Sequence, residues 1–160
     1  MVLGREQLRF SGSLLKRGFW IYLWRIRSRE KMIIYVGRTG DNSSRYASSP
    51  FNRLSTHLDL RQTAKGNSLV RLLKGKGINP VSCTFEMLAV GPLFKEQRSY
   101  RSHKPYRDRT ALLEAELASY LKEKGYEVLG NHPKCGEYDR RIFAKLKKTV
   151  DRFLSKSNSG

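Results

Sequence analysis

The feature that most constrains this chain is a pair of short apolar segments joined by five polar residues. The segments at 19–26 and 32–39 are rich in aromatic and β-branched residues, and residues 27–31 between them are polar. Two such runs with a short polar connection predict a β-hairpin. Each segment carries one tyrosine near its middle, Tyr22 in the first and Tyr35 in the second. The hairpin would therefore hold two phenols on neighbouring strands.

The charge of the chain indicates what such a protein binds. The chain has 160 residues, a length that suits one domain with a sizeable core. It carries 32 Lys and Arg against 14 Asp and Glu, a formal net charge of +18 spread over its whole length. A cationic folded body attracts polyanions, and nucleic acid is the usual one. A ribosomal-type protein, or a merely basic soluble one, is the alternative that charge alone leaves open.

The cysteines and the apolar runs exclude other classes of protein. The two cysteines, Cys83 and Cys135, form no CxxC pair and no His/Cys cluster, which argues against a structural zinc site. No apolar run reaches the roughly 20 residues that span a bilayer, and the first residues lack the apolar region of a secretory signal. We therefore expect a cytoplasmic protein with no membrane partner and with reduced thiols.

The remaining sequence predicts helices and one more strand. Apolar spacing and terminal Pro or Gly residues predict helices at 50–58, 68–75, 111–124 and 140–154. Thr110 is the expected cap of the third helix. A strand is predicted at 81–90, closed by Gly91-Pro92, and residues 126–138 are turn-rich.

This order of elements predicts one domain over residues 1–160, with its core at about 18–132. Residues 1–17 are a basic lead-in, and a short polar tail follows the last helix. The expected fold class is α/β, with a small three-stranded, mostly antiparallel sheet flanked by helices.

The hairpin and the segments after it resemble the GIY-YIG nuclease family. The matching motifs occur in the family's order: Trp20-Ile21-Tyr22, Tyr35-Val36-Gly37, Arg53, His57, Glu114 and Asn131. The resemblance covers roughly residues 18–132. Trp20 stands where the family usually has glycine. The segments before Arg53 and after His57 are longer than in minimal members, as in restriction-type and phage-type ones.

The resemblance implies a metal-dependent DNA endonuclease. Hydrolysis of a phosphodiester needs an activated water, charge stabilisation on the phosphoryl oxygens and help for the leaving alkoxide. Glu114 is the candidate ligand of Mg²⁺, or alternatively Mn²⁺; Mg²⁺ often takes only one or two carboxylates and keeps its waters. Glu116 competes for this role, because helical periodicity does not choose between the two. The family pattern, a glutamate three residues before Leu117, favours Glu114.

The same resemblance implies roles for the other residues of the pattern. Arg53 would grip the scissile phosphate. Tyr35 is the leading general base, and its pKa of about 10 would have to be lowered by Arg53, Arg38 and the metal. His57 is the alternative base or the partner that polarises a tyrosine, and Tyr22 would support the network. Without the family pattern, the two tyrosines would be an aromatic cross-strand pair.

Two further sets of residues complete the expected site. Asn131 would be a hydrogen-bonding strut beside the metal carboxylate or the phosphate, or else a turn residue. The segment 94–109 interleaves Lys and Arg with tyrosines, a pattern typical of a nucleic-acid surface. His103, within this segment, is expected to contact solvent or DNA. The expected nucleic-acid contacts are Arg38, Lys95, Arg98, Arg101, Lys104 and Arg107.

Site-specific cleavage of double-stranded DNA, as by a restriction enzyme, is the expected activity. It would most simply use a homodimer with one active site for each strand. The alternatives are a structure-specific or nicking nuclease of repair or phage type, and a non-catalytic nucleic-acid-binding protein that keeps the fold.

Overall fold

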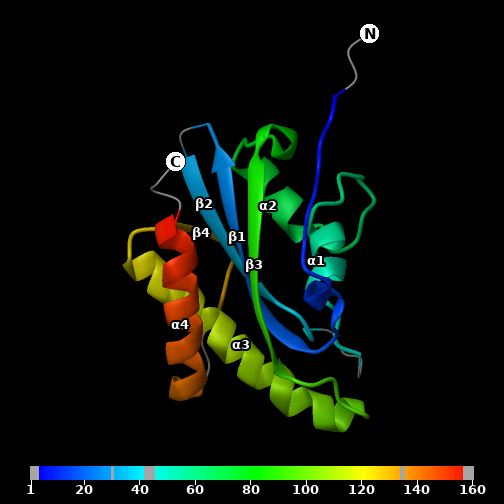
Figure 1. The fold of residues 1–160 in the computed structure, drawn as a ribbon, viewed down its shortest axis with the longest axis vertical. Helices are drawn as coiled ribbons and strands as arrows, with labels where there is room; N and C mark the ends of the chain where they lie inside the picture. Colours follow the sequence, from blue (N-terminus) through cyan, green and yellow to red (C-terminus); the bar gives the residue numbers. More distant parts are fainter. Residues whose placement is uncertain (1–3, 30, 42–45, 134–135, 157–160) are drawn as a thin grey trace.

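The computed structural model of the protein describes residues 4–29, 31–41, 46–133 and 136–156 (Figure 1). Within these ranges the chain forms an α/β fold in which four helices flank a four-stranded mixed sheet. The strands are β1 (Phe19–Ser28), β2 (Lys31–Arg38), β3 (Thr84–Phe94) and β4 (Glu127–Leu129). The helices are α1 (Pro50–His57), α2 (Ser68–Gly75), α3 (Tyr100–Glu123) and α4 (Arg140–Ser155). Two short 3₁₀ turns are η1 (Gly12–Leu15) and η2 (Pro80–Ser82).

The sheet has the order β3-β1-β2-β4 and contains the expected hairpin. β1 pairs antiparallel with both β2 and β3, so the three expected strands are confirmed. The expectation of only three strands is wrong, because β4 pairs parallel with β2 and sets Leu129 beside Tyr35. β4 is three residues long, too short for an alternating pattern to reveal it within the turn-rich segment 126–138.

Two elements, α3 and β3, have bounds that differ from the expected ones. α3 begins at Tyr100 rather than after Thr110, and its N-cap is Ser99, whose hydroxyl accepts a hydrogen bond from the Ser102 N–H. Thr110 lies inside the helix, where its hydroxyl donates to the Tyr106 carbonyl. β3 begins at Thr84 rather than at residue 81, because Pro80–Ser82 form η2, and it continues through Gly91-Pro92 instead of ending there. Because α3 begins at Tyr100, its first ten residues belong to the basic segment 94–109.

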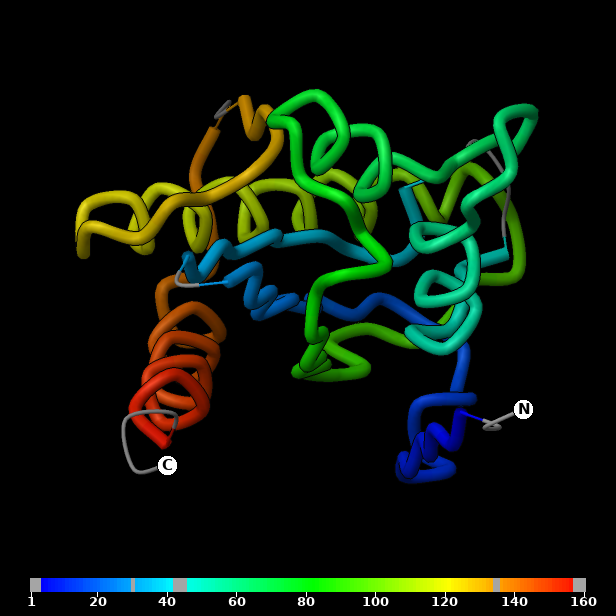
Figure 2. Tube along the Cα trace, turned by 90° about the horizontal axis from the view of Figure 1, so that it is seen from above, coloured from blue at the N-terminus to red at the C-terminus, as the bar shows by residue number. Residues whose placement is uncertain are grey.

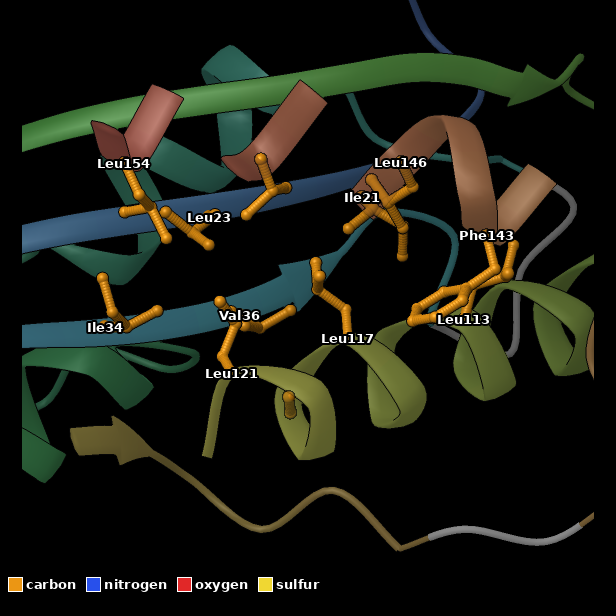
Figure 3. Packing of buried hydrophobic residues seen from close by; sticks show 12 residues of the cluster. Ile21, Leu23, Ile34, Val36, Leu113, Leu117, Leu121, Phe143, Leu146 and Leu154 are labelled. Carbon is orange, nitrogen blue, oxygen red and sulfur yellow. The ribbon is translucent and has the colours of Figure 1, made fainter. Parts of the chain in front are cut away.

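The two faces of the sheet are covered by different helices. Ile21, Leu23, Ile34 and Val36 point toward α3 and α4, where they meet leucines such as Leu117 (Figure 3). The alternate residues of the same strands point toward α1 and α2. This alternation follows from the two-residue period of a strand. No helix in the described ranges is both long and apolar enough to cross a membrane.

Candidate active site

The glycine opposite Tyr22 determines where that tyrosine points. Tyr22 on β1 lies directly across from Gly37 on β2. A Cβ atom on Gly37 would lie 2.5 Å from Cε2 of Tyr22, far inside van der Waals contact. The ring of Tyr22 therefore lies against the bare Gly37 backbone. Its hydroxyl reaches Nε2 of His57 on α1 at 2.6 Å.

A chain of polar side chains is buried between the sheet and α1 and α2. Nε2 of His57 contacts the Tyr22 hydroxyl, and Nδ1 lies 2.7 Å from Oγ of Ser68, the first residue of α2. The hydroxyl of Tyr35 lies 3.4 Å from the same Oγ. Burial, with the nearby charge of Arg53, lowers the pKa of His57 to about 4. The imidazole is thus neutral at pH 7, so one nitrogen donates and the other accepts.

The two phenols are protonated at neutral pH. Burial raises the pKa of both Tyr22 and Tyr35. Arg53 lowers the pKa of Tyr35, as expected, but the net shift is upward. Burial outweighs the opposing influence of Arg53, and Arg38 is paired with the carboxylate of Glu114.

Arg53 lies one turn before His57 on α1 and is held by an acidic residue. Its Nη2 donates to Oδ2 of Asp41 at 2.6 Å, and its Nε lies 3.4 Å from the Tyr22 hydroxyl. The Arg53 side chain is 21% exposed and that of Asp41 is 33% exposed. This guanidinium is thus within reach of an incoming anion, which would compete with Asp41 for it.

A cavity of about 680 Å³ opens beside this network, between α2, α3 and the segment that follows β4. Figure 2 shows α2, in green, next to the orange segment after β4. The polar side chains in the described lining are Tyr35, Arg38, Ser68, Arg71, Glu114, Asn131 and His132. Tyr35 and Ser68 belong to both the cavity wall and the buried network. Tyr22, Arg53 and His57 do not line the cavity.

Glu114 is the carboxylate in the described lining of the cavity, and it forms an ion pair with Arg38. Its side chain is 12% exposed. Burial raises the pKa of Glu114, although Arg38 and His132 oppose the shift. Glu116 lies outside the lining.

The oxygen donors at the cavity fit a hard divalent ion. The Glu114 carboxylate and the Asn131 side-chain amide both border it. Mg²⁺ needs few protein ligands because it keeps several waters, and the cavity has room for them. Within the described residues no group of three or more His, Cys, Asp or Glu side chains gathers at one point. Because Arg38 is paired with Glu114, a bound metal ion would either share the Glu114 carboxylate with Arg38 or displace Arg38 from it.

Four residues at the site had no signal in the sequence pattern: Asp41, Ser68, Arg71 and His132. Ser68 looked only like the start of a helix, and Asp41 like a loop residue. His132 lines the cavity, and its Nε2 donates to the Val36 carbonyl at 3.0 Å. Contacts of this kind join distant parts of the chain, so spacing along the sequence does not reveal them.

Most of the expected nucleic-acid contacts lie on the surface around the start of α3. Lys95, Arg98, Arg101 and Lys104 are exposed. Arg107 is partly buried, pairs with Asp108 and donates to the Tyr100 hydroxyl. Arg38 is not a free surface cation, because it is bound to Glu114.

His103 differs from the rest of the basic segment. The expectation that it contacts solvent or DNA is wrong, since its side chain is fully buried. Its Nε2 donates to the Gly40 carbonyl at 2.9 Å, and its ring packs 4.7 Å from that of Phe19. His103 thus fastens α3 to the loop that follows β2.

Comparison of the chain with models of protein families, with curated proteins and with solved structures gives no match. The interpretation of the cavity therefore depends on its own residues. Trp20, which stands where the resembled family has glycine, is buried, and its indole N–H donates to the Lys16 carbonyl at 3.0 Å.

Proposed function

We propose that this protein is a metal-dependent DNA endonuclease of the GIY-YIG type. One observation carries the proposal. Tyr35, Glu114 and Asn131 line one cavity, and a run of close polar contacts leads from Tyr35 through Ser68 to His57. These side chains come from five separate segments of the chain, so their convergence does not follow from sequence proximity. Phosphodiester hydrolysis needs such a set: an anion-binding group, a proton acceptor and a carboxylate.

Tyr35 is the proposed proton acceptor because it is the phenol that lines the cavity. A water in the cavity attacks phosphorus in line, and the P–O bond to the leaving alkoxide breaks as the new bond forms. Tyr35 takes the proton of the water while its own proton passes to Ser68, and the Ser68 proton passes to Nδ1 of His57. His57 holds that proton only transiently, because its pKa is about 4.

Arg53 is the proposed phosphate-binding residue. Its planar guanidinium matches two phosphoryl oxygens, and it stays charged at any accessible pH. Phosphate would replace the carboxylate of Asp41 as its partner. The neighbouring contact between Nε and the Tyr22 hydroxyl keeps the side chain oriented.

Glu114 and Asn131 are the proposed holders of Mg²⁺, or of Mn²⁺. The bound ion would neutralise charge on the phosphoryl group and on the leaving oxygen. Glu114 suits this task better than Glu116, because Glu116 does not reach the cavity lining.

The basic surface around the start of α3 is the proposed DNA contact. Its exposed cations would neutralise phosphates and release counterions. Glu114 lies further along the same helix, so DNA held by the first turns of α3 would run toward the cavity. We propose duplex DNA cut at specific sites by a homodimer in the cytoplasm, with one active site for each strand.

The test is incubation of supercoiled plasmid with Mg²⁺ and with EDTA. We expect the wild type to cut in Mg²⁺ and not in EDTA, and Glu114→Ala to lose activity by about 10³-fold or more. Glu116→Ala is the matched control and should cut normally. A wild type that shifts DNA in a gel but cuts no substrate would overturn the nuclease assignment.

The ends of the cleavage products separate the remaining alternatives. One recurring end sequence supports a site-specific enzyme. Ends that map to junctions, flaps or unpaired positions support a structure-specific one. Cuts in one strand only, made by a monomer, would contradict the proposed homodimer.

A further inference from the structure

One arginine of the cavity differs from the other two near the site. Arg38 and Arg53 are each bound to a carboxylate, Glu114 and Asp41 respectively. Arg71 on α2 is exposed and lines the cavity. Its side chain has no hydrogen bond or ion pair with any other residue that the structure describes. Arg71 therefore presents to the cavity a charge that no described carboxylate balances.

The position of Arg71 relates it to the proposed chemistry. Ser68 and Arg71 are three residues apart on α2, so they lie on the same side of the helix, about 5–6 Å apart at Cβ. Ser68 contacts Tyr35, the proposed proton acceptor. Arg71 thus lies one helical turn along the cavity wall from the reacting centre.

The cavity is larger than the reacting group requires. Six waters around a divalent ion fill about 180 Å³, since each occupies about 30 Å³ in the liquid. The cavity measures about 680 Å³, which leaves room for a further part of a strand. Leu72 follows Arg71 on α2, and the described lining also includes the small residues Ala111 and Ala115 of α3. Apolar and small side chains leave room for a sugar, and an arginine that is not paired with Glu114 suits a phosphate.

We propose that Arg71 is a substrate-binding residue that holds the phosphate next to the scissile one. The inference rests on the proposed nuclease function and adds a second phosphate to its substrate. A strand with its scissile phosphate at Tyr35 and Glu114 follows the cavity to Arg71 at the neighbouring nucleotide. The contact fixes the strand along the cavity and acts in binding rather than in bond breaking.

The test neutralises one phosphate at a time in a DNA duplex whose cut position has been mapped. Each duplex carries a single methylphosphonate. Fluorescence anisotropy gives the dissociation constant of each duplex for the wild-type protein. EDTA is present, so that the protein binds the DNA without cutting it. The same dissociation constants are measured in the presence of Mg²⁺ with a Glu114→Gln variant, which should bind the DNA without cutting it. We expect one neutral position beside the scissile phosphate to weaken binding about tenfold, a typical cost for a charged contact.

The decisive measurement repeats the series with Arg71→Ala. That variant should bind the unmodified duplex about tenfold more weakly, and the same neutral position should then cost nothing further. Its salt dependence should also fall by about one unit of slope. Lys74→Ala is the matched control, because Lys74 is exposed on the same helix but does not line the cavity. It should leave the pattern unchanged.

One outcome would overturn the inference: a methylphosphonate pattern that is identical in Arg71→Ala and in the wild type. If DNA is cut but the pattern does not change, only this inference fails. If no DNA is cut, the proposed function fails.

Discussion

The two faces of the sheet are made by the same strands but are built on different principles. The face toward α3 and α4 is apolar, with Ile21, Leu23 and Val36 packed against leucines of the helices (Figure 3). The face toward α1 and α2 is mixed. There Tyr22 and His57 join in a buried hydrogen bond among apolar neighbours such as Trp24.

This difference separates stability from chemistry. Apolar packing stabilises through the area removed from water and needs no exact partner. A buried polar group is costly when its partner is lost. Substitutions of the apolar residues packed between the sheet and α3 and α4 should therefore change stability and leave cleavage intact. Substitutions on the α1/α2 face should change cleavage by more than their effect on stability.

Tyr35→Phe should have the largest effect. We expect cleavage to slow by about 10³-fold, because the variant loses the proposed proton acceptor. The free energy of unfolding should change by less than about 1 kcal/mol, since the hydroxyl makes one long contact, at 3.4 Å to Ser68. Single-turnover cleavage and urea denaturation measure the two quantities.

Tyr22→Phe is the matched comparison. It removes the 2.6 Å bond to His57 and should cost about 1–3 kcal/mol of stability. Its cleavage defect should be smaller than that of Tyr35→Phe. A larger cleavage defect in Tyr22→Phe than in Tyr35→Phe would assign proton transfer to Tyr22 and His57 instead.

Leu117→Ala tests the apolar face and should be next in size. Leu117 is fully buried, and its truncation should destabilise the protein by about 3 kcal/mol. Cleavage per folded molecule should be unchanged at temperatures where the variant is folded. Leu60→Ala is the control, because Leu60 is 49% exposed and its loss should cost less than about 0.5 kcal/mol. Normal stability with lost cleavage in Leu117→Ala would break the proposed division between the faces.

The pH dependence of stability should be smaller again. Burial lowers the pKa of His57 from 6.5 to about 4, so between these values the unfolded state binds the proton and the folded state does not. The free energy of unfolding should therefore fall as the pH drops from about 6.5 to about 4, by about 2–3 kcal/mol for this group. His57→Gln should lack this part of the profile. Parallel profiles for the two proteins would show that His57 is not kept neutral by the fold.

Local patterns predicted the hairpin and the short helices because short-range features determine them. The alternation of Ile21, Tyr22 and Leu23 reflects two differently covered faces, and Pro50 marks the first turn of α1. The start of α3 was missed because Pro105 and the surrounding charges resemble a loop. The helix there is favoured both by the N-cap at Ser99 and by the burial of His103.

The family resemblance predicted part of the candidate site, but it predicted neither all of its residues nor its electrostatics. Tyr35 and Glu114 line the cavity, and His57 joins Tyr35 through Ser68, a residue that carried no signal in the sequence. The direction of the Tyr35 pKa depends on burial, which the sequence does not state. The pairing of Arg38 with Glu114 joins residues that are 76 positions apart.

Asp41→Asn should have the smallest effect. It tests whether Asp41 competes with DNA phosphate for Arg53. The pair of Asp41 and Arg53 is partly exposed, at 33% and 21%, so its loss should cost less than about 1 kcal/mol of stability. DNA binding in EDTA should tighten about threefold, because a negative charge near the phosphate is removed and Arg53 is released. Asp59→Asn is the control, since it removes the same charge from a pair with Arg61 outside the site and should not alter binding. Weaker binding by Asp41→Asn would mean that Asp41 orients Arg53 for phosphate rather than competing with it.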